Sequence, residues 1–488
     1  MVRTTFRRRV SAAAAAAAMV GGLLVGGLAA GAAPAAAADP YAGYLFSYFT
    51  GEGTSTGERV YFALSRGNDP VRYDELNGGG SILTSTVGTG GVRDPFIIRH
   101  PTSGTFYQIA TDLKMNGYGN WDAAQRTGSR SIVVWESTDL VTWSAPRLEL
   151  VSPATAGNTW APEAYWDDAA GHFVVFWASK LYATSDPNHT GSSHNRMMYA
   201  TTTDFNTFTP AQVWKDPGYS VIDSTVAKDG GTYYRFTKDE RSNTSSTPCG
   251  KFIFSESSTS LTSTSWTPLQ TCIGKTTSSN PGVSAAEGPT IFKSNTENRW
   301  YLFLDEFGGQ GYVPFTATSL GATTWTKVSS FDLPASPRHG TVLPVTQAEY
   351  DRLLATYGSR SLVARHSGKC ADVPNQSRAT GVAITQYTCN GGANQKWRAI
   401  DAGSGYVRLQ GVQSGLCLQA ATSRSAVTQE TCDTGTDQQW TVTSSGGYDR
   451  VAVRSSGRCL DVNGASTANS AAVLTWTCNG ATNQQWSR

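Results

Sequence analysis

The sequence lacks the features of several common classes of protein. Lysine and arginine (39) nearly balance aspartate and glutamate (37), and removing four arginines near the start from the net charge of +2 leaves about −2. No strong field therefore attracts nucleic acid or an anionic membrane. The absence of a closely spaced Cys-x-x-Cys pair disfavours a zinc site. Beyond the first 38 residues, no apolar run is long enough to span a bilayer.

The first 38 residues have the pattern of an export signal. Four arginines between positions 3 and 9 precede a stretch of Ala, Gly and Leu, and small residues end at Ala38, before Asp39. A transmembrane anchor fits less well, because Ala and Gly dominate the apolar run. We expect a signal peptide over 1–38 and a secreted, extracellular protein. The adjacent arginines leave both the general secretory and the twin-arginine routes open.

Cysteine usage agrees with export. The eight cysteines are even in number, and six of them lie in three local pairs. In an oxidising compartment such spacing indicates disulfides. The expected pairs are Cys249–Cys272, Cys370–Cys389, Cys417–Cys432 and Cys459–Cys478.

A short apolar strand that opens on a polar residue recurs five times. The openings are RDPFII at Asp94, APEAYW at Glu163, IDSTVA at Asp223, EGPTIF at Glu287 and RHGTVL at His339. They lie 69, 60, 64 and 52 residues apart by subtraction, and such a period with four strands per unit is typical of a β-propeller. Because the innermost strands of a propeller line its channel, we expect these side chains to converge in one cavity.

The remaining strands of each unit support an all-β propeller with five blades. Aromatic strands follow the first four openings, at 105–112, 172–180, 232–240 and 299–308. The fifth unit lacks its second and third strands, which occur instead at 44–53 and 61–73. A blade shared between the two ends of the domain closes the ring and leaves no open sheet edge.

A second repeat follows the propeller domain (40–358). Residues 346–358 are expected to form a short amphipathic helix. Three units then end in Gln-x-Trp at Trp397, Trp440 and Trp486, 43 and 46 residues apart by subtraction, and each unit contains a Cys pair. Residues 359–488 resemble the ricin-type β-trefoil lectins, also classed as carbohydrate-binding module family 13. The resemblance implies that these tryptophans are core residues.

The resemblance also implies which residues bind sugar. A shallow sugar site needs a carboxylate, an aromatic face and amides that fix orientation. The first and third units supply these as Asp372, Tyr387, Asn394 and Gln395, and as Asp461, Trp476, Asn483 and Gln484. The middle unit has Gln419 and Glu430 in place of the carboxylate and the aromatic, so we expect two working pockets. The alternative is that Asp372 and Asp461 only cap turns.

Carboxylates that face each other across a small cavity suit glycoside hydrolysis. A protonated one serves the leaving oxygen and an ionised one serves water, and a separation of about 6.5–9.5 Å implies inversion. Close packing of like charges also raises some of their pKa values, so that one carboxyl group can keep a proton near neutral pH.

Region 40–358 resembles glycoside hydrolase family 43, whose five-bladed propellers carry an Asp base, an Asp that modulates pKa and a Glu acid. The motifs RDPFI, VIDSTV and EGP match these at Asp94, Asp223 and Glu287, respectively. We expect the three residues to share one phase of the repeat; a turn or cap role is the alternative. Arg93 departs from the family pattern, which often has His or Pro before the base, and this leaves the substrate pocket undefined.

Four further channel residues each have two open roles. Trp160 is a sugar platform or packing, and Glu163 binds sugar hydroxyls or braces the channel. Arg338 reaches a substrate hydroxyl or forms an ion pair between blades. His339 coordinates a channel cation, such as the water-surrounded calcium that the family often holds, or is a hydrogen-bonded histidine. The chemistry itself requires no cofactor.

The motifs are most similar to those of arabinofuranosidase-like members of the family. We therefore expect a monomeric, secreted, inverting exo-glycosidase, an α-L-arabinofuranosidase that acts on polysaccharide side chains. β-D-Galactofuranosidase is the nearest alternative, followed by β-xylosidase and arabinanase. A non-catalytic bivalent lectin is the alternative from another class, and the intact Asp/Asp/Glu set argues against it.

Overall fold

The computed structural model describes residues 41–421 and 425–487. The segment 1–38, for which a signal peptide is expected, lies outside the described residues. In the described part of the chain, no helix is both long and apolar enough to cross a membrane.

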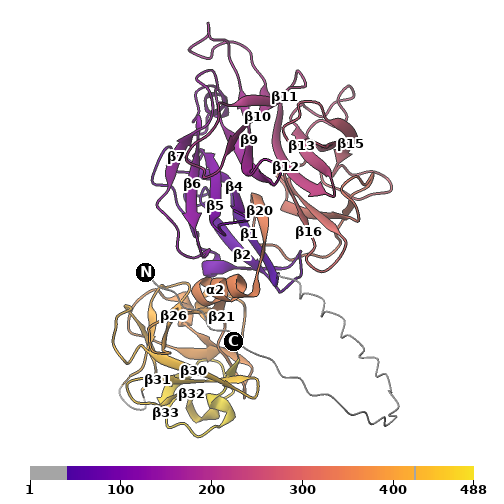
Figure 1. The fold of residues 1–488 in the computed structure, drawn as a ribbon. Helices are drawn as coiled ribbons and strands as arrows, with labels where there is room; N and C mark the ends of the chain where they lie inside the picture. Colours follow the sequence, from indigo (N-terminus) through magenta and orange to yellow (C-terminus); the bar gives the residue numbers. More distant parts are fainter. Residues whose placement is uncertain (1–40, 422–424, 488) are drawn as a thin grey trace, which may run out of the picture. The chain divides into compact units, whose positions relative to one another are not determined.

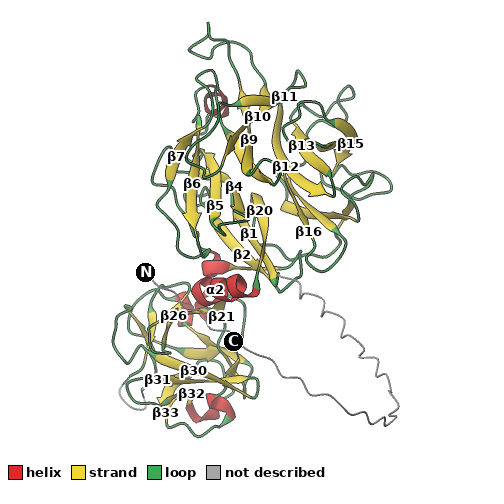
Figure 2. Ribbon diagram, in the orientation of Figure 1, coloured by secondary structure: helices red, strands yellow, loops and turns green. Residues whose placement is uncertain are grey.

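Residues 43–345 form five antiparallel sheets of four strands, here called blades 1 to 5 (Figures 1 and 2), which confirms the predicted propeller. Blade 1 contains β4 (Val92–Arg99), β5 (Phe106–Asp112), β6 (Ser131–Ser137) and β7 (Arg147–Leu150). Blade 2 contains β8 (Trp160–Asp167), β9 (His172–Lys180), β10 (Asn195–Thr202) and β11 (Gln212–Lys215). Blade 3 contains β12 (Val221–Asp229), β13 (Thr232–Asp239), β14 (Ile253–Ser258) and β15 (Thr267–Ile273). Blade 4 contains β16 (Glu287–Lys293), β17 (Trp300–Glu306), β18 (Gly311–Ala317) and β19 (Thr326–Lys327). Blade 5 contains β20 (Arg338–Val345), β1 (Gly43–Phe49), β2 (Tyr61–Ser65) and β3 (Tyr73–Glu75).

Blade 5 joins the two ends of the domain, as predicted. The last strand, β20, lies beside β1 (Figure 1) and pairs with it antiparallel. In this register Leu343 lies opposite Leu45. The stretch 61–73, expected as one strand, instead forms β2 and the first residue of β3, because a turn at 66–72 separates them. The first strands of consecutive blades contact one another around the ring, so β4, β8, β12, β16 and β20 are the inner strands.

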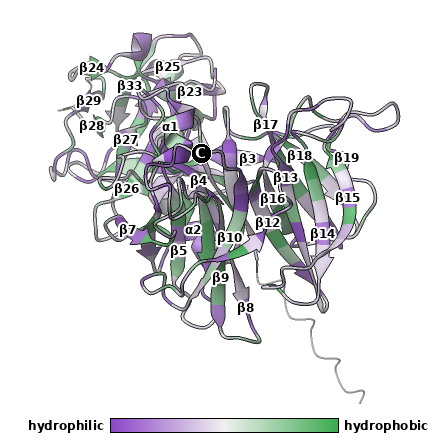
Figure 3. Cartoon of the chain, turned by 90° about the horizontal axis from the view of Figure 1, so that it is seen from above, coloured by the Kyte–Doolittle hydropathy of each residue, from purple (hydrophilic) through white to green (hydrophobic). Residues whose placement is uncertain are grey.

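Apolar side chains fill the space between neighbouring blades. Tyr107 of blade 1 packs on Phe205 of blade 2 with ring centroids 4.5 Å apart, and Phe236 of blade 3 meets Trp325 of blade 4 edge to face at 5.4 Å. Such pairs add to the free energy gained by burying apolar area. Figure 3 shows hydrophobic residues concentrated on the strands, whereas the loops are mainly hydrophilic.

Three short helices lie in the described residues that precede the trefoil. They are η1 (Leu76–Gly79), α1 (Trp121–Arg126) and α2 (Gln347–Tyr357). The last is the predicted helix, and it begins with a capping box in which Thr346 and Glu349 satisfy each other's backbone N–H groups. Its Leu353 is fully buried against blade 5 and blade 1 side chains.

Residues 359–487 form the expected β-trefoil. Its strands are β21 (Ser359–Arg360), β22 (Val363–Ala364), β23 (Lys369–Asp372), β24 (Val382–Ala383), β25 (Thr385–Tyr387), β26 (Trp397–Asp401), β27 (Val407–Gly411), β28 (Cys417–Gln419), β29 (Thr428–Glu430), β30 (Trp440–Ser445), β31 (Tyr448–Val453), β32 (Cys459–Val462), β33 (Ala471–Trp476) and β34 (Trp486–Ser487). Its short helices are η2 (Pro374–Gln376), η3 (Ala393–Gln395), η4 (Asn463–Ala465) and η5 (Thr482–Gln484).

The three Gln-x-Trp tryptophans are buried, as predicted. Each indole N–H donates to a backbone carbonyl near the first cysteine of its own unit: Trp397 to Ala371, Trp440 to Leu418 and Trp486 to Leu460. All four predicted disulfides are formed, one in the propeller and one in each unit of the trefoil.

Candidate active site

Each inner strand is interrupted by a bulge near its start. The pairing register shifts after Arg93 in β4, after Trp160 in β8, after Ile222 in β12, after Glu287 in β16 and after Arg338 in β20. A bulge leaves residues of one strand unpaired and redirects their side chains. The repeat therefore places one irregular position per blade at corresponding points of the ring.

The residues at these bulges correct one prediction. Asp94, Asp223 and His339 occupy the first bulge position of their strands, where blades 2 and 4 have Ala161 and Gly288. All but His339 have positive φ, between 49° and 52°. Glu287 instead precedes its bulge, so the expectation that it shares the phase of Asp94 and Asp223 is wrong. The reason is that in EGP the glycine, not the acid, takes the left-handed conformation, which it adopts at little cost.

A pocket of about 300 Å³ opens at these bulges. It is lined by Phe49, Arg93, Asp94, Leu113, Trp121, Gln125, Trp160, Asn195, Ile222, Asp223, Lys238, Glu240, Glu287 and His339. The structure thus brings Asp94, Asp223 and Glu287 together, from three different blades.

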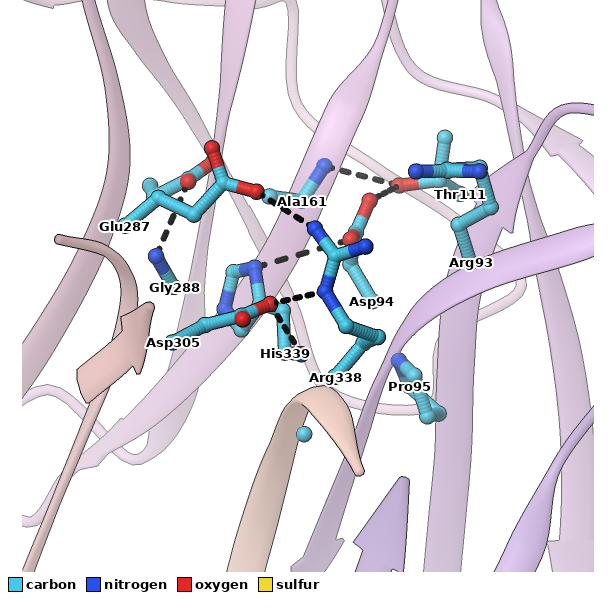
Figure 4. A network of polar contacts seen from close by, with 12 residues as sticks. Arg93, Asp94, Pro95, Thr111, Ala161, Glu287, Gly288, Asp305, Arg338 and His339 are labelled. Atoms are coloured by element: carbon cyan, nitrogen blue, oxygen red, sulfur yellow. Dashed lines mark hydrogen bonds and ion pairs between the residues drawn. The ribbon is translucent and has the colours of Figure 1, made fainter. Parts of the chain in front are cut away.

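Asp94 is held from two sides. Thr111 of β5 donates its hydroxyl to Oδ2 over 2.8 Å, and the same hydroxyl accepts the N–H of Ala161 at 2.7 Å. The Nδ1 atom of His339 lies 3.5 Å from Oδ1 (Figure 4). Both oxygens are therefore oriented by neighbours, while the side chain still lines the pocket.

Asp223 is buried at the junction of blades 3 and 4. Its Oδ2 accepts the peptide N–H of Gly288 at 3.1 Å. Burial, reinforced by the negative charges of Glu287 and Asp94, raises the pKa of Asp223 to about 7, although His339 and Lys238 oppose the shift.

Glu287 meets one cation at each oxygen. Lys238 donates to Oε2 at 2.6 Å and Arg338 donates to Oε1 at 2.9 Å (Figure 4 shows the second bond). Burial favours the neutral acid, but the charges of these two cations outweigh it and lower the pKa of Glu287. In the substrate-free protein, Glu287 is therefore ionised, and Asp223 is the neighbour that keeps a proton toward neutral pH.

His339 sits among carboxylates. Its Nε2 is 3.8 Å from Oε1 of Glu163, and its Nδ1 faces Asp94. Burial alone lowers its pKa, but the nearby carboxylates of Glu163, Asp223 and Asp94 raise it to about 9. The imidazole is therefore protonated at neutral pH, and its two nitrogens face Asp94 and Glu163 at ion-pair distances.

A cation bound directly to His339 would have to displace a proton from the imidazole, because the protonated ring has no free lone pair. Within the residues that the structure describes, no group of three or more His, Cys, Asp or Glu side chains is arranged to hold a metal ion. A channel calcium remains a prediction.

The other predicted channel residues lie close by. Glu163 is 2% exposed, and burial raises its pKa. Arg338 forms the alternative predicted for it, an ion pair between blades, with its Nε 2.6 Å from Oδ2 of Asp305. Trp160 lines the pocket, and its ring lies edge to face with that of Trp121, with centroids 6.1 Å apart.

Arg93 has a structural environment that the sequence did not show. Its guanidinium contacts Glu58 at 3.0 Å and Glu52 at 2.9 Å, and it lies over the rings of Phe49 and Trp121. The residue next to Asp94 is thus held by its own ion pairs.

Trp121, Lys238 and Asp305 are among the residues in or near the pocket that were not predicted. Lys238 and Asp305 are buried charged residues near the ends of strands β13 and β17, and Asp305 has one oxygen without a hydrogen-bond partner. For Asp305, a charged residue near the end of an otherwise apolar strand was the available signal. Trp121 is 41% exposed and stands at the start of α1.

The first and third units of the trefoil share one arrangement. In the first, Asn394 and Gln395 each donate to Oδ2 of Asp372 at 2.9 Å, beside the exposed Tyr387 and a cavity of about 240 Å³. In the third, Asn483 and Gln484 make the same bonds to Asp461, beside the exposed Trp476. In the middle unit, Gln438 donates to Gln419 instead.

In the first and third units the amides are held by the carboxylate of their own unit, and sugar binding by these four amides stays a prediction. Gln395 and Gln484 are buried and donate to the carboxylates, so they fix the orientation of Asp372 and Asp461. Burial raises the pKa of both carboxyl groups.

Two family models match the chain. The one described as a probable glycosyl hydrolase domain, related to glycosyl hydrolase family 43, matches residues 39–351, which is more than half of the sequence. The one described as a ricin-type beta-trefoil lectin domain matches residues 358–486.

A curated relative, an alpha-L-arabinofuranosidase of Bifidobacterium longum subsp. longum, is 35% identical over 322 residues. The match covers 59% of this chain but only 29% of the relative, so the chain corresponds to less than a third of that protein.

Two solved structures are also similar in part. The designed three-fold symmetric protein ThreeFoil is 42% identical and matches 27% of this chain and 96% of its own, with a TM-score of 0.26. An exo-beta-1,3-galactanase from Clostridium thermocellum is 17% identical and matches 83% of this chain and 98% of its own, with a TM-score of 0.36. Together with the two family models, the carboxylate-lined pocket of the propeller leads to one assignment: this chain belongs to the glycoside hydrolases related to family 43, and its hydrolase domain is followed by a ricin-type β-trefoil lectin domain.

Proposed function

We propose that the protein is a secreted, inverting α-L-arabinofuranosidase that removes terminal residues from polysaccharide side chains. Two observations support the proposal. Three carboxylates from different blades line one pocket, and the 35% identical relative over the propeller is an alpha-L-arabinofuranosidase. The pocket is small, which suits a single terminal sugar rather than a long chain.

Asp94 is the proposed general base. It removes a proton from a water molecule whose oxygen attacks the anomeric carbon from the face opposite the leaving group. Thr111 and His339 bind its two oxygens, so the lone pair is directed without a change of side-chain conformation. The anomeric configuration of the product is then inverted.

Glu287 is the proposed general acid, and Asp223 modulates its pKa. The glycosidic bond breaks as Glu287 gives its proton to the leaving oxygen. Because the two carboxyl groups interact, they share their last proton and titrate as a pair. In the free protein this proton resides on Asp223, so the productive form is the one in which it has moved to Glu287.

The trefoil is proposed to hold the enzyme on its polymer. Two pockets on one domain, centred on Asp372 and Asp461, gain affinity through effective concentration when a polysaccharide presents many equal residues. The substrate class is carbohydrate for both domains, and we propose that the enzyme acts as a monomer.

A panel of nitrophenyl glycosides tests the proposed activity. We expect the α-L-arabinofuranoside to be hydrolysed fastest, ahead of the β-D-galactofuranoside and β-D-xylopyranoside, with little endo-cleavage of linear arabinan. Proton NMR of the first product should show the inverted anomer. Hydrolysis of none of these substrates, with retained polysaccharide binding, would favour the non-catalytic lectin.

A further inference from the structure

Lys238 is a buried lysine whose ammonium group joins two carboxylates. It is 2% exposed, and its Nζ lies 2.6 Å from Oε2 of Glu287 and 2.7 Å from Oε2 of Glu240. A second lysine, Lys251, holds the other oxygen of Glu240 at 2.7 Å. Residues of blade 3 thus form a charged chain that ends on the proposed acid of blade 4.

The position of Lys238 is fixed by the sheet as well as by charge. It pairs with Ile222 in the register of β13 and β12, immediately before the bulge that carries Asp223. Its ammonium also lies 4.5 Å from the centre of the Phe307 ring. A lysine side chain has large rotamer entropy, and these contacts with Glu287, Glu240 and Phe307 restrict it.

Glu287 is surrounded by charged groups of both signs, which shift its pKa in opposite directions. The charged groups that face Glu287 from the strands packed against it are Lys238 of β13, Asp223 of β12, Asp305 of β17, and Arg338 and His339 of β20. Arg338 is itself paired with Asp305, whose carboxylate offsets part of its charge. Lys238 shares its charge with Glu240, which Lys251 in turn neutralises.

We propose that Lys238 is a positioning residue that holds the carboxylate of Glu287 in place and sets the alkaline limit of hydrolysis. The inference rests on the acid role proposed for Glu287. Because a general acid works only when protonated, activity is lost as pH rises through the apparent pKa of the pair formed by Glu287 and Asp223. A cation next to the pair moves that limit to lower pH.

The first test is the pH dependence of kcat/KM for Lys238→Met, measured on an arabinofuranoside with a poor leaving group. Removing an adjacent positive charge should move the alkaline limb upward by about one pH unit or more. Lys238→Arg keeps the charge and should leave the limb near that of the parent. Lys228→Met, in the same blade but hydrogen-bonded to Tyr233 rather than to a pocket carboxylate, is the matched control and should change nothing.

A second variant should shift the alkaline limb in the opposite direction, and its result does not depend on whether Lys238→Met folds. Glu240→Gln removes the carboxylate that competes for Lys238, so the full charge acts on Glu287 and the limb should move to lower pH, by ~0.5 unit or more. If Lys238→Met and Glu240→Gln both fold and both keep the alkaline limb of the parent, the inference is wrong. It is also wrong if Lys228→Met shifts the limb as much as Lys238→Met does.

A dinitrophenyl arabinofuranoside separates this inference from the function on which it rests. With so good a leaving group the acid is not needed, and the shift should disappear. If Glu287→Gln lowers kcat/KM by the same factor on both substrates, the acid role is wrong. If Glu287→Gln discriminates between the substrates but Lys238→Met leaves the limb unchanged, only the role of Lys238 is wrong.

Discussion

Gly288 donates its peptide N–H to Oδ2 of Asp223 over 3.1 Å, and this bond joins the bulges of two neighbouring blades. Both residues have positive φ, 49° and 52° respectively. The residue just before Gly288 is Glu287, so the backbone that carries the proposed acid is tied to the side chain of the proposed modulator. The two carboxyl groups can therefore share a proton without either blade moving.

Gly288→Ala should impair this link. A Cβ atom would lie 2.6 Å from Cγ of the His339 ring, and the left-handed conformation costs an L-residue ~1 kcal/mol. We expect kcat/KM to fall by ~10-fold or more, since small displacements of reacting groups cost this much. Gly230→Ala is the control: it has φ +57° but nothing within 4 Å of the new Cβ. Equal losses in both variants would show that the contact with His339 is unimportant.

Asp223→Asn should shift the pH profile. In the parent, kcat/KM on a poor leaving group should fall above about pH 7, where the pair loses its last proton. Asparagine removes the negative charge beside Glu287, while Lys238 and Arg338 remain and lower the pKa of Glu287. The alkaline limb should therefore move to lower pH. A limb that stays in place or moves upward would contradict the pairing of these residues.

His339 makes stability depend on pH in a defined window. Its pKa is about 9 in the folded protein and 6.5 in a free side chain, so the folded state binds the extra proton. The resulting stabilisation is complete below pH 6.5 and is lost as pH rises through 9. His339→Gln should lower the free energy of unfolding at pH 7 by about 3 kcal/mol, because it leaves buried carboxylates without their cation.

Urea unfolding of the propeller at several pH values measures this effect. Between pH 7 and 9 the free energy of unfolding of the parent should decline more steeply than that of the His339→Gln variant. Parallel declines would mean that His339 does not carry the proton assigned to it.

The trefoil pockets are tested by a double variant, Asp372→Ala with Asp461→Ala. Retention on insoluble polysaccharide should be lost, whereas hydrolysis of a small aryl glycoside should be nearly unchanged. Gln419→Ala is the matched control, because the middle unit lacks the carboxylate and the aromatic residue, and it should bind as the parent does. Unchanged retention by the double variant would exclude these pockets, and a loss of small-substrate activity would contradict independent domains.

The fold was largely predictable because it is repetitive. Five similar openings and three Gln-x-Trp units identify a propeller and a trefoil even where single strands are misjudged, as at 61–73. The disulfides followed from pairs of cysteines close in sequence. Repeats of this kind carry local information that a single sequence displays.

The details of the site were less predictable, because they depend on contacts between distant segments. The position of Glu287 within the repeat is set by the bulge at Gly288, and a bulge depends on how the strand pairs with its neighbour. Lys238 lies 49 residues from Glu287 in sequence, and nothing near it signals the contact. The protonation of His339 likewise depends on carboxylates contributed by three other blades.

The central claim is that Glu287 protonates the leaving oxygen while Asp94 activates water. The most direct measurement compares kcat/KM of Glu287→Gln and Asp94→Asn on two arabinofuranosides, one with a poor and one with a good leaving group. The account predicts that Glu287→Gln loses ~10²–10⁴-fold on the poor leaving group and far less on the good one, whereas Asp94→Asn is severe on both. Equal and mild losses in both variants, on both substrates, would contradict it.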